Sequence, residues 1–121
     1  MVRQLLCAVV FLAAAVAANA EPLKLAHNYD AVGTNPDGSK YTGTVTIDII
    51  SDTTFSIVWK IGDETYKGFG MRRNDALAAT YTIGGEPGLM VYQVDDKGIM
   101  RGLWAVRGEN GNGSEVFTPH Q

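Results

Sequence analysis

Cysteine and histidine are both scarce in this chain. It has one cysteine, Cys7, and two histidines, His27 and His120. A disulfide needs two thiols, so a fold stapled by disulfides within the chain is excluded. A zinc site needs three or four converging ligands, and neither histidine has a ligand-type partner at metal-binding spacing. We therefore expect no metal and no cofactor, and a fold held by burial and hydrogen bonding.

Clustered positive charge is also lacking. Without residues 1–20 the chain has nine Lys and Arg against 13 Asp and Glu, a formal charge of −4. The adjacent cations Arg72 and Arg73 are followed closely by Asp75. Proteins that bind duplexes use grouped cations to displace counterions from phosphates. Nucleic acid is therefore not an expected partner.

The apolar run near the N-terminus is too short to cross a bilayer. It extends over residues 5–18, follows the cation Arg3 and ends at Ala18-Asn19-Ala20. A membrane-spanning helix needs about 20 apolar residues, whereas this pattern is typical of a secretory signal peptide. We predict a signal peptide over 1–20, cleavage after Ala20 and one domain over 21–121, in the periplasm or outside the cell.

Side chains downstream alternate with the period of a β-strand. Tyr41, Gly43, Val45, Ile47 and Ile49 share one phase, and so do Phe55, Ile57, Trp59 and Ile61. Turn residues such as Gly62-Asp63 separate such runs. The pattern predicts strands near 23–32, 41–49, 55–61, 64–72, 77–83, 89–94, 99–107 and 115–118.

The short connections predict an all-β antiparallel meander of about eight strands. They leave no room for helical crossovers, so consecutive strands are expected to pair. The one-sided alternation and the 14 glycines, all after residue 20, favour an up-and-down barrel. A sandwich of two sheets is the alternative.

One stretch of sequence resembles a known group of proteins. Its pattern is Tyr29-x-x-Val32-Gly33-x-Asn35-Pro36-Asp37-Gly38-Ser39-x-Tyr41-x-Gly43-x-Val45, followed by Trp59 with Gly62 and by Gly68-x-Gly70. This resembles small exported proteobacterial proteins that are often named fibronectin-binding. The shorter segment Gly102-Leu103-Trp104 is similar to the Gly-x-Trp segments of avidin-like and lipocalin-like barrels. The first resemblance implies protein interaction, and neither implies a catalytic residue.

The aromatic residues allow two interpretations, a filled core or a ligand cavity. Core filling is favoured in so small a barrel, but such barrels also hold small molecules at one mouth. The candidate ligand-binding residues are Trp59, Tyr66, Arg72, Tyr81, Arg101 and Trp104.

The expected function is non-enzymatic binding of a small ligand or an envelope component, with adhesion to an extracellular protein as the alternative. A small hydrolase is a remote third. It would need a histidine in a cleft or a buried acid with a raised pKa. The acids of this sequence are expected in turns and on polar strand faces, where they titrate normally.

Overall fold

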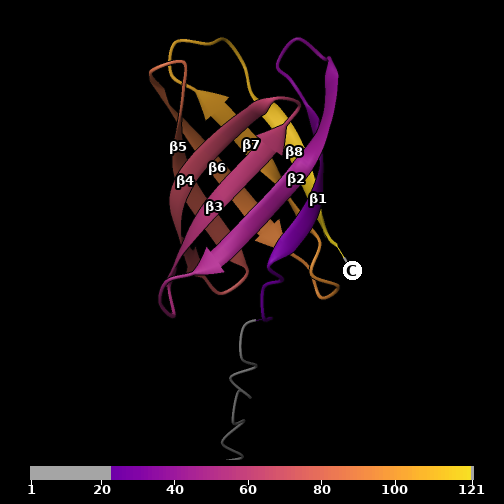
Figure 1. Ribbon diagram of the computed structural model, residues 1–121, viewed down its shortest axis with the longest axis vertical. Helices are drawn as coiled ribbons and strands as arrows, with labels where there is room; N and C mark the ends of the chain where they lie inside the picture. The colour runs from indigo at the N-terminus through magenta and orange to yellow at the C-terminus, as the bar shows by residue number, and fades with distance from the viewer. Residues whose placement is uncertain (1–22, 121) are drawn as a thin grey trace, which may run out of the picture.

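The computed structural model describes residues 23–120, which form a closed barrel of eight antiparallel strands in sequence order (Figure 1). The strands are β1 (Asn28–Thr34), β2 (Lys40–Ile49), β3 (Thr54–Ile61), β4 (Glu64–Arg73), β5 (Ala76–Ile83), β6 (Glu86–Val94), β7 (Met100–Val106) and β8 (Gly113–Pro119). Pairing of β1 with β8, from Tyr29 opposite Pro119 to Thr34 opposite Ser114, closes the sheet. The predicted up-and-down barrel is confirmed, and the sandwich is excluded.

All eight predicted strands are present, but the first begins later than expected. Residues 23–27 lie outside β1 and fold under one end of the barrel, where Leu25 and Ala26 pack against the core. The amide of Ala26 donates a hydrogen bond of 2.7 Å to the hydroxyl of Tyr29. Burial of these apolar groups stabilises the bend more than an extension of the strand into solvent would. The predicted signal peptide, 1–20, lies outside the described residues.

The alternation predicted for β2 and β3 separates the interior from the surface. Val45 and Ile47 on β2 are buried, as are Phe55, Ile57 and Trp59 on β3. The polar residues between them face outward on β2, so one face of the sheet forms the core. Ile49 is the exception to the predicted phase, because it ends β2 beside a turn and is exposed.

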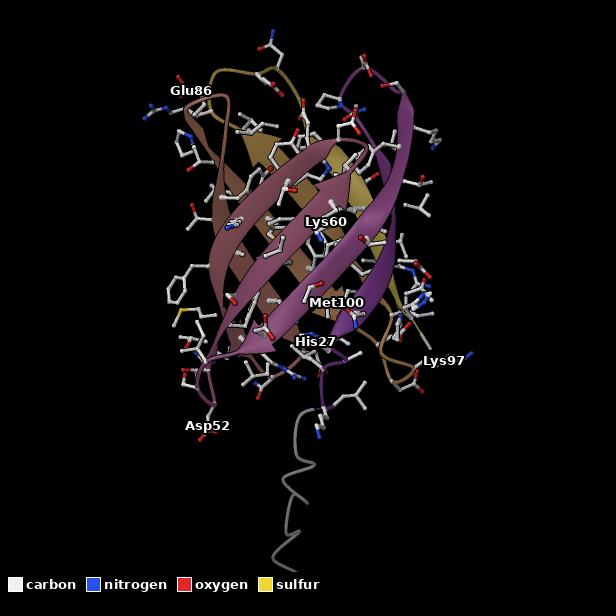
Figure 2. The ribbon with its side chains drawn as sticks, in the orientation of Figure 1. His27, Asp52, Lys60, Glu86, Lys97 and Met100 are labelled. Carbon is white, nitrogen blue, oxygen red and sulfur yellow. The ribbon has the colours of Figure 1, made fainter. Side chains whose placement is uncertain are left out.

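The chain direction divides the connections between two ends of the barrel. The upper mouth consists of residues 35–40, 62–64, 84–86 and 107–112, and the lower end of residues 23–27, 50–53, 73–75, 95–98 and 119–120. At the upper mouth Gly62 turns β3 into β4 with a φ of 58°, as its sequence predicted. Figure 2 shows Glu86 at the upper mouth and His27, Asp52 and Lys97 at the lower end. Within residues 23–120 no helix is long and apolar enough to span a membrane.

Candidate functional site

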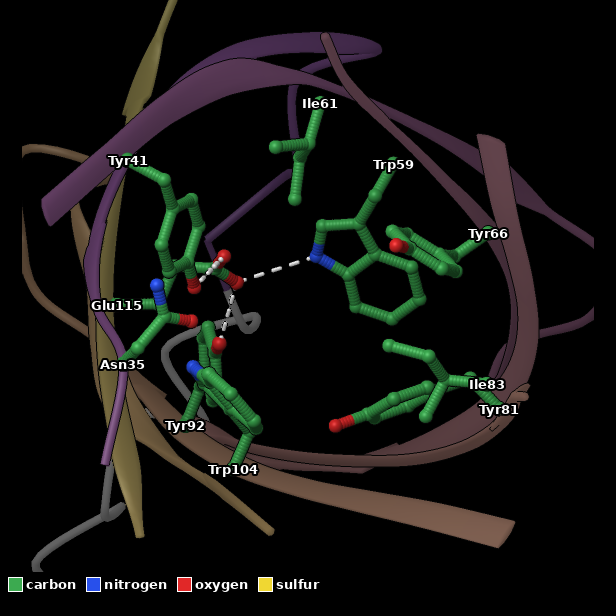
Figure 3. Close-up of a pocket in the computed structure, with 10 residues that line it drawn as sticks. All are labelled: Asn35, Tyr41, Trp59, Ile61, Tyr66, Tyr81, Ile83, Tyr92, Trp104 and Glu115. Atoms are coloured by element: carbon green, nitrogen blue, oxygen red, sulfur yellow. Dashed lines mark hydrogen bonds between the residues drawn. The ribbon is translucent and has the colours of Figure 1, made fainter. Parts of the chain in front are cut away.

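A cavity of about 160 Å³ lies inside the barrel near the upper mouth (Figure 3). Its lining residues are Asn35, Tyr41, Trp59, Ile61, Tyr66, Tyr81, Ile83, Tyr92, Trp104 and Glu115. Asn35, Ile61 and Ile83 border the connections of the upper mouth, so the cavity reaches that end of the barrel. An apolar cavity of roughly 150 Å³ inside a protein is large enough to hold one molecule of benzene.

Every strand from β2 to β8 contributes one large aromatic or acidic side chain to the cavity. In chain order they are Tyr41, Trp59, Tyr66, Tyr81, Tyr92, Trp104 and Glu115. Each sits at an inward position of its strand, because residues two apart on a strand share a face. The closure of the sheet therefore brings seven chain-distant groups around one space, as the ring of side chains in Figure 3 shows.

Glycines on neighbouring strands let four of these rings lie against the barrel wall, including those of Trp104 and Tyr81. Trp104 is paired with Gly113 and Tyr81 with Gly88. A Cβ atom at either glycine would collide with the ring that covers it. An aromatic ring over an inward-facing glycine uses the space that a side chain would fill. The rings consequently line the wall and leave the centre of the upper barrel open.

Glu115 is the buried acid of the site, with 4% of its surface exposed. Its Oε1 accepts hydrogen bonds from the indole Nε1 of Trp59 at 3.1 Å and from the hydroxyl of Tyr92 at 2.5 Å. Its Oε2 accepts one from the hydroxyl of Tyr41 at 2.6 Å. The dashed lines in Figure 3 mark these three bonds. The donors come from β2, β3 and β6, so the carboxyl ties together strands from across the barrel.

Burial sets the protonation equilibria around Glu115. Removal from water raises the pKa of Glu115 above its ordinary value of 4.5, while hydrogen bonds from Tyr41, Tyr92 and Trp59 oppose the rise. Burial also raises the pKa values of Tyr41 and Tyr92 far above 10, and the nearby Glu115 charge adds to this. The pKa of Tyr81 rises to about 12 for the same reasons. These tyrosines therefore remain neutral hydrogen-bond donors at physiological pH.

Trp104 places a further hydrogen-bond donor in the site, one that does not bind Glu115. Its indole Nε1 is buried and makes no well-formed hydrogen bond with the described residues, although it lies near the hydroxyl of Tyr41 and acts to lower the pKa of that group. The ring stands edge-on to Tyr41, with 6.4 Å between the ring centroids. A buried N–H without an acceptor costs free energy, about 1–3 kcal/mol. A water or a ligand with an acceptor atom in the cavity would remove that cost.

The structure brings four of the six predicted candidates together. Trp59, Tyr66, Tyr81 and Trp104 all line the cavity. Arg72 lies instead at the lower end of the barrel, where it lines a separate groove with Phe55, and its Nε donates to the carbonyl of Asn74 at 2.7 Å. The exposed side chain of Arg101 is paired with Asp95 at 2.9 Å. Arg72 lies away from the cavity because β4 runs toward the lower end. Arg101 lies away from it because its side chain faces outward on β7.

Glu115 was missed by the sequence analysis, and the expectation that the acids titrate normally is wrong for it. Its signal was present in the alternation of β8, where Gly113, Glu115 and Phe117 occupy the same phase and all are buried. An acid in phase with an inward Phe117 indicates a buried carboxyl. Tyr41 was likewise outside the candidate set, because only the closed barrel shows that it meets Glu115.

The chemistry available in the cavity is hydrogen bonding, π contact and one negative charge. Glu115 is the single carboxyl group among the lining residues, which include no His, Lys, Ser or Cys. His27 lies near the lower end, where its Nδ1 is 3.0 Å from the carbonyl of Ile47. Between residues 23 and 120 no group of three or more His, Cys, Asp and Glu side chains is arranged to hold a metal.

Comparison with known proteins supports the fold. No protein-family model matches the chain, and no curated protein matches it either. Among solved structures, a redesigned β-barrel has a TM-score of 0.68 at 16% identity, over 80% of this chain and 92% of that one. A de novo fluorescence-activating β-barrel has a TM-score of 0.62 at 17% identity, over 79% and 94%. A point mutant of the fluorescent protein UnaG has a TM-score of 0.53 at 9% identity, over 79% and 96%.

Proposed function

We propose that this protein is an exported, non-enzymatic binding module that takes a small ligand into the cavity at the upper mouth. The observation that carries the proposal is a cavity of about 160 Å³ in which Glu115 and the unpartnered Nε1 of Trp104 converge between aromatic walls. Binding sites commonly combine mostly apolar walls with a few polar groups that fix orientation. If these side chains served only to fill the core, they would leave no such space.

The cavity lining includes no second carboxyl group and no Ser, Cys, Lys or His that could act with Glu115 in catalysis, and this favours binding. Hydrolysis by paired carboxyl groups needs a second acid about 5–9 Å away, and nucleophilic catalysis needs a nucleophile beside a base. The three groups that contact Glu115 are neutral donors. They hold the carboxyl in place, and as neutral donors none of them acts as a base toward it.

Export is part of the same proposal. The apolar run 5–18 and the small residues Ala18 and Ala20 support cleavage before Glu21. N-terminal sequencing of protein from a periplasmic or culture fraction would return Glu21 as the first residue. A first residue at Met1 in that fraction would contradict the proposed processing.

Native mass spectrometry of protein purified from its own exported fraction tests the binding function. We expect a retained small-molecule adduct on the unsubstituted protein. Ile83→Trp, which places an indole at the cavity lining, should abolish the adduct. Ile50→Trp is the matched control, because Ile50 is 60% exposed at the lower end and the adduct should persist.

Two results would contradict the binding function. An adduct that survives Ile83→Trp would place the ligand elsewhere on the protein. A bare chain, combined with no thermal stabilisation by any member of a small-molecule library, would indicate that the cavity is a packing defect. The library screen is needed because a weak ligand dissociates during purification.

Adhesion is a second candidate, favoured by an apolar band on the outer surface. The band consists of Phe69, Met71, Ala78, Leu89, Val91, Leu103 and Ala105 on β4 to β7. Cross-strand pairing makes it continuous, since Ala78 pairs with Val91 and Val91 with Leu103. Phe69, Leu89 and Val91 are each more than half exposed. Large exposed apolar patches often mark protein-interaction sites.

Surface plasmon resonance with immobilised fibronectin tests this second candidate, whose partner class comes from the sequence resemblance. If the apolar band mediates adhesion, the protein binds and the double substitution L89K/V91K abolishes binding. Val32→Lys is the matched control, because Val32 is 54% exposed on β1, outside the band. No binding, or equal binding by the double variant, would contradict adhesion through this band.

A further inference from the structure

Glu115 lacks a positively charged partner among the residues that the structure describes. Its three hydrogen-bond donors are the neutral side chains of Tyr41, Trp59 and Tyr92, and the cavity lining includes no Lys, Arg or His. A carboxylate has about four positions at which it accepts hydrogen bonds, and three of these are used. One position on Oε2 is therefore available at the cavity. An uncompensated buried charge is costly, and a bound cation would offset that cost.

Aromatic side chains make up most of the cavity lining. Five aromatic side chains besides Tyr92 line it, namely Tyr41, Trp59, Tyr66, Tyr81 and Trp104. Trp59 and Tyr81 are in contact, with 5.2 Å between tilted ring centroids. The faces of such rings are negative, and they attract alkylammonium groups. Aromatic walls around a carboxylate are suited to an organic cation.

The charge of the upper mouth has the sign that attracts a cation. Its acids are Asp37, Asp63, Glu64, Glu86 and Glu109, and its cations are Lys40 and Arg107. Arg107 is already paired with Glu86 at 3.0 Å. The lower end is more nearly balanced, with Asp52, Asp75, Asp95 and Asp96 against Lys24, Arg73 and Lys97. An acidic rim around a cavity raises the local concentration of cations.

We propose that the ligand is a small organic cation, a quaternary or protonated amine that also carries a hydroxyl or carbonyl oxygen. This inference rests on the proposed binding function. The cationic group would lie between the aromatic faces and Glu115, and the oxygen would accept the hydrogen bond that Trp104 Nε1 leaves unmade. The volume of about 160 Å³ limits the ligand to roughly the size of one benzene ring.

Isothermal titration calorimetry with two probes of equal shape tests the charge of the ligand. The first probe is choline, and the second is its uncharged isostere, in which a tert-butyl group replaces the trimethylammonium group. We expect the unsubstituted protein to bind choline at least about tenfold more tightly than the isostere, which corresponds to about 1.4 kcal/mol. This comparison needs no substitution, so it does not depend on the folding of any variant.

Two substitutions then assign the preference to Glu115. Glu115→Gln removes the charge at nearly constant volume and should reduce choline affinity about tenfold or more while leaving the isostere unchanged. Asp52→Asn makes the same change of charge at the lower end and should leave both affinities unchanged. Circular dichroism of each variant reports that the barrel is intact.

The outcomes separate this inference from the binding function on which it rests. Equal or tighter binding of the isostere overturns the cationic ligand but leaves the binding function standing. If neither probe binds at millimolar concentration, the cationic ligand is also overturned. The presence or absence of a native adduct then decides whether the binding function stands. A choline preference that is retained in Glu115→Gln overturns the role of the carboxylate.

Discussion

At the scale of single residues, the site depends on one buried carboxyl group, that of Glu115. Burial raises the pKa of Glu115, so its folded state holds a proton more tightly than its unfolded state does. The groups facing it from other strands are Tyr41, Tyr81 and Tyr92, which all stay protonated over the same pH range. Among these groups only Glu115 titrates in this range, so its titration makes the local stability depend on pH.

Glu115→Gln should reveal this titration. A raised pKa means that the protonated carboxyl stabilises the fold fully below pH 4.5, and that this contribution is lost as the pH rises through the folded pKa. The free energy of unfolding of the unsubstituted protein, minus that of the variant, should fall as the pH rises above about 4.5, by up to about 1.4 kcal/mol per unit of pKa rise. Urea unfolding at several pH values measures it. A difference that grows with pH would show that the three donors outweigh burial.

Glu115→Leu should cost far more than Glu115→Gln. The leucine leaves the donors of Tyr41, Trp59 and Tyr92 without their acceptor, whereas a glutamine oxygen still accepts from Trp59 and Tyr92. We expect a loss of about 2–5 kcal/mol for the leucine at pH 7, measured by urea unfolding. A leucine variant as stable as the glutamine variant would show that these donors find other acceptors.

At the scale of secondary-structure elements, neighbouring strands are fitted to one another by rings over glycines. Gly113→Ala on β8 should destabilise the barrel by about 1–3 kcal/mol, because the new methyl group collides with the ring of Trp104 on β7. Urea unfolding measures the loss, and near-ultraviolet circular dichroism reports the displaced indole. Ser114→Ala, one residue on and exposed, is the control. Equal stability of the two variants would contradict the close approach.

The segment 23–27 is fixed to the lower end by apolar packing and by hydrogen bonds, among them the bond from the Ala26 amide to the hydroxyl of Tyr29. Tyr29→Phe removes the acceptor of the Ala26 amide and should cost about 0.5–1.5 kcal/mol. Hydrogen exchange of the Ala26 amide should accelerate at the same time. Tyr81→Phe is the matched control, since the Tyr81 hydroxyl makes no hydrogen bond with the described residues. Unchanged exchange in Tyr29→Phe would show that the other contacts of the segment, including the hydrogen bond from the Ile47 amide to the His27 carbonyl, protect the Ala26 amide.

At the scale of the whole molecule, closure removes the two edges that an open sheet would have. Backbone amides of β1 and β8 that pair with one another should exchange with solvent hydrogen as slowly as those shared by β5 and β6. Hydrogen exchange followed by nuclear magnetic resonance measures this, with the amides of 110–112 as the fast reference. Early exchange confined to β1 and β8 would indicate that the barrel opens along this seam.

Prediction from sequence succeeded where the signal is local. Alternation placed Phe55, Ile57 and Trp59 on one face, and Gly62-Asp63 marked a tight turn. These signals depend on residues two apart or adjacent, so they survive without tertiary information. The start of β1 was wrong because nothing local distinguishes a strand from a bend that buries Leu25 and Ala26.

The sequence by itself determined eight strands in a meander and four of the residues that line the cavity. Only the tertiary structure decided that β1 pairs with β8, that Glu115 meets Tyr41, Trp59 and Tyr92, and that Arg72 lies elsewhere. The physical reason is separation along the chain, since Tyr41 and Glu115 are 74 residues apart. Strand phase fixes which side a residue faces, but the register and closure of the whole barrel fix which residues share one height inside it.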